Sequence, residues 1–487
     1  MKSTPAVTGQ LSEQPTLIVD LDGTLVRTDT LIECILAAIN HPLKLSQGLL
    51  ALRSGKAAMK QQIATVADLK PTLLPYNEKL LSLLRVEAAS GRSLILATGA
   101  DRKIASAVAD HLGIFDAVLA SDGNLNLTGA TKLKAIRQMV GDRPFTYIGN
   151  DRKDLPIWRE ARSGIVVNAP AFVEREAGRA TNIEAATVAR TSCLKGLLQA
   201  IRPYQWSKNL LVFVPIITAR AVDDLAAWGS AIFMFLAFSA AASGMYLVND
   251  LLDLAADRQH SRKRSRPFAS GALPLHVGLI ASPLLLLAGF GLGAATGTLP
   301  VVLLYVFASM GYSLYLKSQP IVDVFLLAAL YTVRLFGGGI ATGYHVTLWL
   351  LAFSSFLFLS LGIVKRVSEL MTLASQDSGR AAGRGYRPND TGILQLIGVA
   401  SSFASSIVLA FYIQSGPGAG LDTSPTFPTL IWALVPLILF WQCRIWLSTA
   451  RGRMHDDPII FAARDWVSWL VAICCLVVFL LGDRIDL

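Results

Sequence analysis

The stretch Leu225–Val248, LAAWGSAIFMFLAFSAAASGMYLV, is an unbroken apolar run, and Asn249–Asp257, NDLLDLAAD, follows it directly. A membrane-spanning helix needs about 20 mostly apolar residues, because hydrocarbon offers no hydrogen-bond partner to an exposed backbone. The run is therefore predicted to cross a bilayer. Its polar end would then place three aspartates at one membrane surface.

Apolar runs of this kind recur through the second half of the chain. The 487 residues are 53% hydrophobic and 16% charged, which is too apolar for a purely soluble protein of this length. Residues up to about Ala200 mix charged and apolar positions as a globular domain does. The remainder predicts about nine transmembrane helices, at Trp206–Thr218, Leu225–Val248, Val277–Ala295, Leu299–Leu316, Ile321–Ile340, Leu348–Val364, Ile393–Ile413, Leu430–Leu447 and Val467–Leu481.

The change in composition near Cys193–Ile201 predicts a domain boundary. We expect a polar tail over residues 1–15, an α/β domain over 16–192, and an all-α polytopic membrane bundle over 193–487. The five cysteines form neither a metal spacing nor a disulfide framework, and Met1–Gln14 lacks the apolar core of a cleavable signal. The α/β domain is therefore expected in a reducing compartment.

Positive charge is concentrated in alternate loops between the apolar runs. The basic connections follow the second, fourth, sixth and eighth runs, at Arg258–Arg266, Lys317, Lys365–Arg387, and Arg451 with Arg453. Connections on the other side, such as Ser415–Thr426, hold no Lys or Arg, with Arg220 as the exception. This pattern predicts an inner (cytoplasmic) membrane protein with its α/β domain in the cytoplasm, and an outside C-terminus if the span count is odd. The net charge of +10 comes without a nucleic-acid motif, so no nucleic-acid partner is predicted.

The aspartates after the second run have a spacing that suits metal chemistry. Asp250, Asp253 and Asp257 stand at i, i+3 and i+7, which predicts three carboxylates on one helical face. Like charges repel there, and Mg²⁺ bridging substrate phosphates would relieve the repulsion. The alternative is a solvated helix end whose carboxylates balance Arg258 and Arg262.

This N-D-x-x-D-x-x-x-D pattern, with about nine spans, resembles the UbiA superfamily of membrane prenyltransferases over Arg202–Leu487. The resemblance implies that Asn249, Asp250, Asp253 and Asp257 hold Mg²⁺ against a diphosphate.

A second acidic motif, usual in that family near the sixth span, is replaced here by the basic stretches Gly362–Leu370 and Gly383–Arg387. This departure, with Arg202–Asn209 and Arg262–Pro267, resembles the branch of decaprenyl-phosphate phosphoribosyltransferases. The resemblance implies phosphoribosyl pyrophosphate as the donor and a polyprenyl phosphate as the lipid nucleophile.

Basic and polar side chains at the cytoplasmic ends of the runs are the candidate phosphate contacts of the membrane half. For Arg334, a structural pairing within the membrane is an equal alternative, and Asp323 can equally be a helix-end carboxylate. For Lys365 and Arg366, a role in topology is the alternative. The full set is Lys208, Asn249, Arg258, Arg262, Lys263, Arg266, Lys317, Arg334, Lys365 and Arg366.

A second candidate site lies near the N-terminus. Leu17–Val19 is a short apolar run typical of a buried parallel strand, and Asp20 and Asp22 follow it at i and i+2. At the carboxyl end of a strand both carboxylates can face one crevice. One can attack phosphorus while the other exchanges a proton with the leaving oxygen.

Three later elements accompany these aspartates: Thr98 after Leu94–Ala97, Lys132, and the acidic loop after Tyr147–Gly149. In this order they resemble the haloacid dehalogenase (HAD) phosphatase superfamily over Thr16–Asn182. The resemblance implies that Asp20 is the nucleophile, Asp22 the acid/base, Thr98 and Lys132 phosphate contacts, and Asp154 metal support. Asn150 stands where the family often has an acid, so either Asn150 or Asp151 completes the Mg²⁺ site. The implied metal ligands are Asp20, Asp22, Asn150, Asp151 and Asp154.

Helical periodicity over Thr28–Arg85 predicts a cap above that cleft. The two halves together predict a transferase that makes a polyprenyl-phosphoryl 5-phosphoribose and a phosphatase that removes its phosphate. The alternatives are a prenyltransferase that moves an isoprenoid chain, a HAD domain with a regulatory role, and a transporter. Clustered carboxylates at a helix end suit phosphate chemistry better than a translocation site at the membrane midplane.

Overall fold

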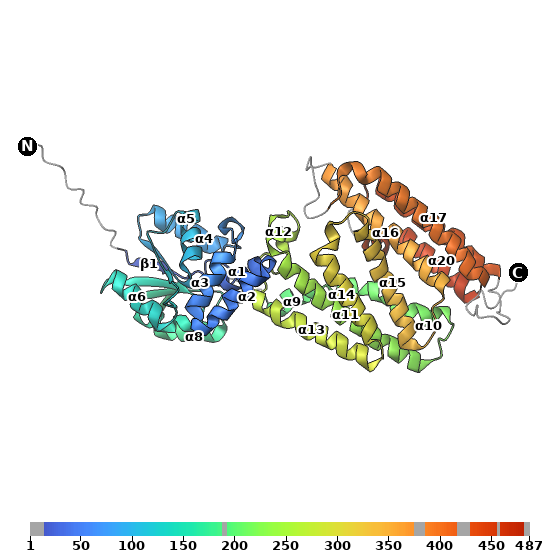
Figure 1. Ribbon diagram of the computed structural model, residues 1–487. Coiled ribbons are helices and arrows are strands. Elements are labelled where there is room, and N and C mark those ends of the chain that lie inside the picture. Colours follow the sequence, from blue (N-terminus) through green and yellow to red (C-terminus); the bar gives the residue numbers. More distant parts are fainter. Residues whose placement is uncertain (1–13, 188–191, 375–384, 416–428, 455–457, 482–487) are drawn as a thin grey trace, which may run out of the picture. The chain divides into compact units, whose positions relative to one another are not determined.

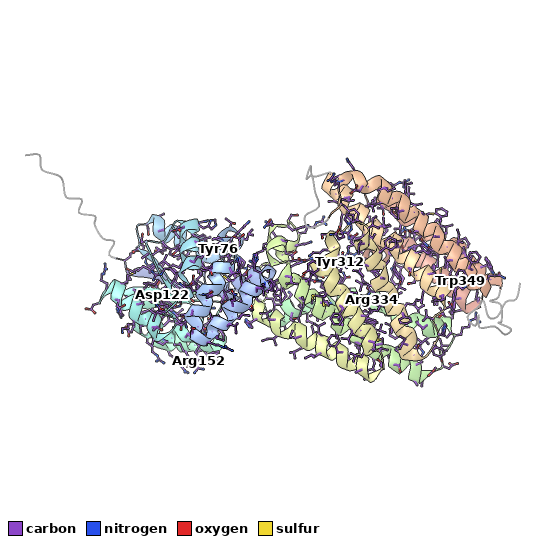
Figure 2. The ribbon with its side chains drawn as sticks, in the orientation of Figure 1. Tyr76, Asp122, Arg152, Tyr312, Arg334 and Trp349 are labelled. Carbon is purple, nitrogen blue, oxygen red and sulfur yellow. The ribbon has the colours of Figure 1, made fainter. Side chains whose placement is uncertain are left out.

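The computed structural model describes residues 14–187, 192–374, 385–415, 429–454 and 458–481 (Figures 1 and 2). The polar N-terminal stretch up to residue 13, most of the expected neutral connection 415–426, and Gly383 and Arg384 of the basic stretch lie outside these ranges. The chain divides into two compact units, which are described separately. One comprises Met1–Ile201 with Tyr246–Ala281, and the other Arg202–Met245 with Ser282–Leu487.

The first unit is built on a six-stranded parallel sheet (Figure 1). In spatial order its strands are β3 (Ala117–Ser121), β2 (Leu94–Asp101), β1 (Thr16–Val19), β4 (Phe145–Gly149), β5 (Ser163–Val167) and β6 (Asn182–Thr187). The central strand β1 pairs Ile18 with Ile95 on one side and with Tyr147 on the other. The expected α/β domain is therefore present, and Asp20 follows the middle strand.

Alternation along β1 divides its side chains between two cores. Leu17 and Val19 belong to one buried cluster, whereas Ile18 belongs to another that includes Trp158. The covering helices are α4 (Glu78–Ala89), α5 (Arg102–Leu112), α6 (Ala130–Val140), α7 (Leu155–Glu160) and α8 (Ala171–Ala180). Burying both faces explains why the strands are continuous apolar runs, as parallel sheets require.

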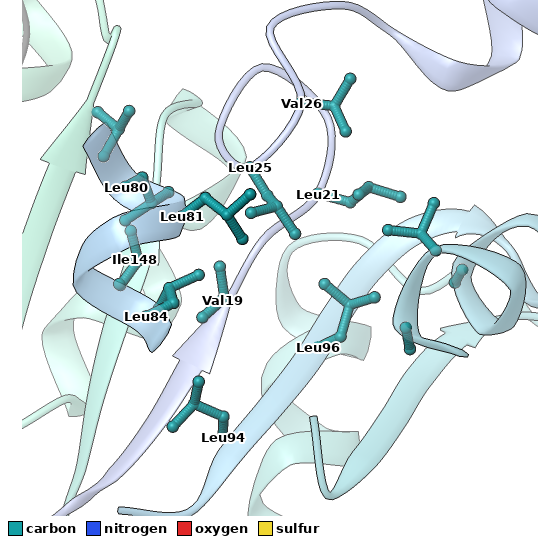
Figure 3. Packing of buried hydrophobic residues seen from close by; sticks show 14 of the residues in the cluster. Val19, Leu21, Leu25, Val26, Leu80, Leu81, Leu84, Leu94, Leu96 and Ile148 are labelled. Carbon is teal, nitrogen blue, oxygen red and sulfur yellow. The ribbon is translucent and has the colours of Figure 1, made fainter. Parts of the chain in front are cut away.

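The cap is shorter than the sequence predicted. Leu80, Leu81 and Leu84 of α4 are buried in the same cluster as Val19 and Leu96 (Figure 3). Helix α4 thus belongs to the layer that covers the sheet. The helices that remain for the cap are α1 (Thr30–Ala37), α2 (Pro42–Leu50) and α3 (Lys56–Val66), joined by 3₁₀ turns at Ala38–Asn40, Ala51–Ser54 and Pro71–Leu73.

The first unit also takes in a segment far along the sequence. It contains α9 (Cys193–Ile201), the end of α11 (Leu225–Leu252), α12 (Leu254–Gln259), a 3₁₀ turn at Lys263–Ser265 and the start of α13 (Leu275–Ala295). The compact unit ends at Ile201, within the stretch Cys193–Ile201 where the composition changes, and it also includes residues 246–281.

The count of nine spans is not confirmed. Within the described ranges, six helices are long and apolar enough to cross a membrane: Leu225–Leu252, Leu275–Ala295, Val322–Thr342, Leu348–Thr372, Pro388–Gln414 and Leu430–Ala450. A seventh is possible if α19 (Pro458–Arg464) and α20 (Trp466–Leu481), bent by 85°, form one span. These helices make the chain an integral membrane protein.

Two expected spans have other structures. Helix α14 (Leu299–Leu314) is apolar but has only 16 residues. The segment predicted at Trp206–Thr218 is a 3₁₀ stretch, Pro203–Phe213, that leads into the five-residue α10 (Val214–Thr218). Pro215 has no amide hydrogen to donate, and at this point the chain passes from the 3₁₀ stretch into the short helix α10.

The remaining helices of the second unit are α15 (Val322–Thr342), α16 (Leu348–Ala374), α17 (Thr391–Ser415) and α18 (Leu434–Ala450). Short 3₁₀ turns occur at Leu316–Ser318, Pro388–Asp390 and Thr429–Ala433. Helices α15, α16 and α17 enclose a buried cluster that contains Val324, Ile363 and Leu394.

Candidate functional site

The carboxyl ends of β1, β2 and β4 surround a cavity of about 490 Å³. Because parallel strands end at one edge of the sheet, residues distant in sequence meet there. The cavity is lined by Asp20, Asp22, Gly99, Lys132, Asn150, Asp151 and Asp154, together with residues from other elements.

Lys132 is the charge centre of this cavity. Its Nζ donates to Asp20 Oδ1 at 2.8 Å, to Asp154 Oδ1 at 3.4 Å and to Tyr147 Oη at 3.1 Å. Only 4% of the Lys132 side chain is exposed, and the two carboxylates are almost as buried. Burial acts to lower the pKa of Lys132, but the charges of Asp20 and Asp154 raise it well above its ordinary value. The ammonium group is therefore fixed between the two acids.

The two leading aspartates are poised differently. Burial raises the pKa of Asp20 to about 6, against the opposing charge of Lys132. Burial and the nearby charge of Asp29 raise the pKa of Asp22 to about 7. Asp22 Oδ1 accepts the Thr30 amide at 2.8 Å, which fixes its orientation at the start of α1. A carboxylate beside a cation and a carboxyl that keeps its proton near neutrality can serve as nucleophile and acid, respectively.

The loop after β4 is held by Asp154. Its Oδ2 accepts the amides of Asn150 at 3.2 Å and Asp151 at 3.1 Å, and its Oδ1 accepts Tyr147 Oη at 2.8 Å. The side chain of Asn150 lies against Gly23, where an added Cβ would be 2.1 Å from Asn150 Nδ2. Gly23 has φ +71°, so both the space and the backbone require glycine in this turn.

Two predicted residues have a different environment from the one expected. Thr98 is fully buried, its hydroxyl accepts the Ala100 amide at 3.0 Å, and the cavity is lined by its neighbour Gly99. Asp151 lines the cavity but forms an exposed ion pair with Lys153 at 3.5 Å. An irregularity in the pairing of β2 with β3 lies in this part of β2, a detail that strand patterning cannot reveal.

Sequence reasoning missed two cavity residues, Lys60 and Arg27, and the buried Tyr147 that contacts the site. Lys60 of the cap helix α3 donates to Gly99 O at 2.6 Å and to Asn126 Oδ1 at 2.9 Å, and burial lowers its pKa. Tyr147 was quoted only as part of a strand, yet its hydroxyl contacts both Lys132 and Asp154. Arg27 follows the aspartate motif and also lines the cavity. A basic residue five positions after Asp22 was the available signal for Arg27.

The aspartates after α11 form the second candidate site. Arg266 Nη1 lies 3.1 Å from Asp250 Oδ1 and 2.6 Å from Asp257 Oδ2, so two of the three carboxylates converge on one cation. Asp253 stands at the break between α11 and α12, with φ −88° and ψ 11°. Burial raises the pKa of Asp257, and Arg266 opposes that shift. The continuous helical face expected for all three aspartates is therefore interrupted at Asp253.

The basic residues around this motif differ in their surroundings. Arg258 forms a two-pronged ion pair with Glu33 of α1, at 3.0 and 2.6 Å, and its Nε donates to Ala269 O at 3.0 Å. Its side chain is 7% exposed, and in this structure its charge is paired with a carboxylate; the phosphate contact stays a prediction. Arg262 and Lys263 are exposed and remain candidates for phosphate contact.

Among the described residues, no three His, Cys, Asp or Glu side chains are gathered to hold a metal ion. Each candidate site brings two carboxylates to one cation, and an amide oxygen can add a third ligand. Asn150 lines the α/β cavity, and Oδ1 of Asn249 is buried without a hydrogen-bond partner. Carboxylate and amide oxygens are the ligands that Mg²⁺ prefers, so both donor sets fit that ion in chemical type.

In the second unit, Arg334, which is labelled in Figure 2, is buried. It donates to Asn209 Oδ1 at 2.7 Å, to Tyr305 Oη at 3.1 Å and to the carbonyl of Leu330. Its guanidinium also stacks over Tyr305, with 4.7 Å to the ring centre. These contacts match the structural alternative for Arg334. Lys208 lies over the ring of Tyr331 at 5.5 Å.

A buried ionic cluster occupies the cytoplasmic ends predicted for α15 and α16. Arg366 Nη2 lies 2.8 Å from Asp323 Oδ2, and Arg366 also pairs with Glu369. Tyr386 Oη donates to Asp323 Oδ1 at 2.5 Å. Arg366 is 1% exposed, so its charge is used within the protein. Lys365 and Lys317 are only partly buried, so both remain candidates for phosphate contact.

Comparison with known proteins agrees with this architecture. A model of the UbiA prenyltransferase family matches residues 210–455, half of the chain. The chain belongs to the UbiA prenyltransferase family. An uncharacterized protein of Sinorhizobium fredii is 35% identical over 463 residues, which cover 93% of this UbiA family chain and 88% of that protein.

A decaprenyl-phosphate phosphoribosyltransferase of Mycobacterium tuberculosis is 29% identical over 285 residues, covering 57% of this chain and 91% of that enzyme. Among solved structures, a HAD family hydrolase from Salmonella enterica serovar Typhi aligns with 33% of this chain and 66% of its own, at 15% identity and a TM-score of 0.26. This UbiA family member is thus similar to a phosphoribosyltransferase over more than half of its length.

Proposed function

We propose that this UbiA family member transfers 5-phosphoribose from phosphoribosyl pyrophosphate to a polyprenyl phosphate, and that its HAD-like domain then removes the 5-phosphate from the product. The observation that carries the proposal is the presence of two separate carboxylate sites, each with a cation between two acids. The phosphoribosyltransferase homologues support the choice of donor and lipid acceptor.

In the transfer step, an oxygen of the lipid phosphate attacks C1 of the ribose. The bond from C1 to the pyrophosphate oxygen breaks, and pyrophosphate leaves with its electron pair. Arg266 and the exposed Arg262 and Lys263 would contact the charged donor, and Lys317 and Lys365 the lipid phosphate. Asp250, Asp253 and Asp257 would orient the donor's phosphates against these cations.

In the hydrolytic step, the Asp20 carboxylate attacks phosphorus while Asp22 gives its proton to the leaving ribose oxygen. The aspartyl phosphate is then hydrolysed by water, whose proton returns to Asp22, and inorganic phosphate is released. Lys132 neutralises charge on the phosphoryl group while it holds Asp20 in line. A proton on Asp22 near pH 7 suits its part as the acid.

Mg²⁺ fits both oxygen-rich sites, with Asp250, Asp257 and Asn249 at one and Asp20, Asp154 and Asn150 at the other, and would supply neutralisation of phosphate charge. We expect the HAD domain to face the cytoplasm, on the same side as the basic connections between the spans.

The second candidate is a prenyltransferase that moves an isoprenoid chain from a prenyl diphosphate to a small acceptor. The family match favours it in general terms. Where the family usually has its second acidic motif, this chain has Arg366, which is paired with Asp323. This difference favours phosphoribosyl transfer over prenyl transfer.

The test uses the purified full chain in detergent with radiolabelled phosphoribosyl pyrophosphate, polyprenyl phosphate and Mg²⁺. Lipid products are separated by chromatography for the wild type, Asp253→Asn and Asp20→Asn. We expect a labelled lipid from the wild type, none from Asp253→Asn, and accumulation of the phosphorylated lipid with Asp20→Asn. Consumption of a prenyl diphosphate without sugar label in lipid would favour the second candidate instead.

A further inference from the structure

Arg27 lines the cavity that contains Asp20 and Asp22, but it has no role in the proposed hydrolysis by Asp20, Asp22 and Lys132. Its Nε is buried without a hydrogen-bond partner, and within the described part of the chain no carboxylate forms an ion pair with its guanidinium. Arg27 as a whole is half-buried, and burying part of a guanidinium without a partner is costly, because arginine stays charged at any physiological pH. Such a group is well placed to receive an anion from a ligand.

Other polar groups next to Arg27 are also unsatisfied. Thr28 lines the same cavity with only 3% of its surface exposed, and its hydroxyl has no hydrogen-bond partner. Thr24 and Asn77 are fully buried, and their side-chain oxygens likewise have none. Asn77 lies beside the segment that holds Thr24, since its backbone N–H donates to Leu25 O at 2.9 Å. Native interiors rarely leave such groups unsatisfied, so the unsatisfied Thr28 hydroxyl beside Arg27 at the cavity wall indicates a ligand subsite.

The backbone holds Arg27 firmly at this place. Its amide donates to Pro75 O at 3.0 Å, and Val26 beside it bridges to Tyr76. On the other side its stem packs on Gly271, where an added Cβ would lie 2.6 Å from Arg27 Cβ. Gly271 has φ +70°, so a side chain there would be both strained and blocked.

The segment that contains Gly271 also forms a wall of the cavity. Ala272, Pro274, Leu275 and His276 line it, and Leu275 is the first residue of the candidate span Leu275–Ala295. The cavity is therefore bounded in part by the chain as it enters a membrane helix.

We propose that Arg27, with Thr28, binds a second phosphate group of the substrate of the HAD-like domain. The inference rests on the proposed phosphatase step and narrows its substrate to esters with two phosphates. One is the terminal monoester attacked by Asp20, and the other is a phosphate at the opposite end of the sugar. Lys132 already serves the reacting phosphate, which leaves Arg27 for a separate anion. A cavity of about 490 Å³ has the size of an ordinary small-molecule site.

The experiment compares ribose 5-phosphate with ribose 1,5-bisphosphate, two soluble esters that differ in the second phosphate. Full-length protein in detergent is assayed with Mg²⁺, and release of the 5-phosphate is followed by ³¹P NMR. The variants are Arg27→Gln, Arg27→Lys, and the matched control Arg53→Gln, which alters an exposed cap arginine outside the cavity.

We expect the wild type to prefer the bisphosphate. Arg27→Gln should lower kcat/KM for the bisphosphate about 10- to 100-fold, mainly through KM, because a charge-assisted contact is lost. It should change kcat/KM for ribose 5-phosphate by less than about twofold. Arg27→Lys should restore part of the preference, and Arg53→Gln should behave as the wild type.

Equal kcat/KM values for the two esters in the wild type would overturn the inference, as would an equal loss for both esters in Arg27→Gln. If the protein hydrolyses neither ester, both the proposed phosphatase step and this inference are wrong. The transferase assay is read separately. If no sugar label enters lipid but the preference for two phosphates holds, the transferase proposal fails and the role of Arg27 stands.

Discussion

Two pairs of carboxylates in this chain each converge on one basic side chain, and they differ in how far that side chain is removed from water. Lys132 lies 2.8 Å from Asp20 and 3.4 Å from Asp154, with 4% of its side chain exposed. Arg266 lies 3.1 Å from Asp250 and 2.6 Å from Asp257, with 27% exposed.

The difference in exposure indicates which of the two basic side chains, Lys132 or Arg266, stays paired with its acids throughout the reaction. Removing a buried partner leaves uncompensated charge in a poorly solvated interior, so Lys132 is a fixed part of its site. Arg266 has access to water and can be rehydrated if it swings away from its acids. We therefore expect the first site to be preorganised and the second to exchange its internal cation for the charges of a substrate complex.

The largest effect should come from the nucleophile of the buried site. Asp20→Asn should reduce phosphate release by at least ~10³-fold, because loss of a covalent nucleophile removes the main reaction path. Transfer of sugar label to lipid should change by less than about twofold. The reciprocal control is Asp250→Asn, which should stop label transfer and spare hydrolysis of a soluble ester. Loss of both activities in either variant would show that the sites do not act independently.

The second prediction compares the two cations directly. Lys132→Met should destabilise its surroundings by about 3–5 kcal/mol, because two buried carboxylates lose their partner. Arg266→Met should cost less, about 1–2 kcal/mol, since the Arg266 side chain is 27% exposed and water already screens its ion pairs in part. Hydrogen–deuterium exchange of the full chain measures this locally, on peptides from β1 and β4 for Lys132 and from α12 for Arg266. Similar increases in exchange at the two places would contradict the distinction drawn from exposure.

The third prediction asks whether Arg258 is structural. Glu33→Gln and Arg258→Gln should each speed exchange in α1 and α12 by a similar amount, and the double variant should add little, because one ion pair is broken in each case. Glu33→Gln should leave the KM for phosphoribosyl pyrophosphate within about twofold of the wild type. A large rise in that KM in Arg258→Gln but not in Glu33→Gln would restore the interpretation of Arg258 as a phosphate contact.

The last prediction concerns the pH dependence of stability. The pKa of Asp22 is about 7 in the fold against an ordinary 3.8. Between these values the unfolded chain has released a proton that the folded chain retains, so the contribution of Asp22 to stability falls as pH rises from about 4 to about 7. Thermal unfolding in metal-free buffer should show this slope in the wild type and a flatter one in Asp22→Asn. Parallel pH profiles would refute the shifted pKa.

Much of this outcome was readable from the sequence. The apolar run Leu17–Val19 followed by Asp20 and Asp22 predicted a buried parallel strand that ends in a site, and β1 is the central strand of that sheet. The long apolar runs predicted a polytopic bundle, because only a helix satisfies its backbone in hydrocarbon. Local patterns of this kind depend on residues that are close in the chain, and these are visible in one sequence.

Partners distant in the chain could not be read in the same way. The pairing of Arg258 with Glu33 spans 225 positions, and the approach of Gly271 to Arg27 is as remote. Both decide whether a basic residue is free to meet a phosphate, and neither leaves a local pattern. The span count failed for a related reason, since apolar composition does not show where Pro203–Thr218 departs from an α-helix.

The sequence by itself thus determined the two domains, the parallel sheet, the membrane helices and the two sets of aspartates. Only the tertiary structure decided that Lys132 lies between two acids, that Asp253 falls at a helix break, and that Arg27 Nε, at the cavity, has no hydrogen-bond partner among the described residues. The physical reason is that periodicity reports burial along one element. Charge pairing depends on which elements meet, and that is fixed by packing between segments far apart in the chain.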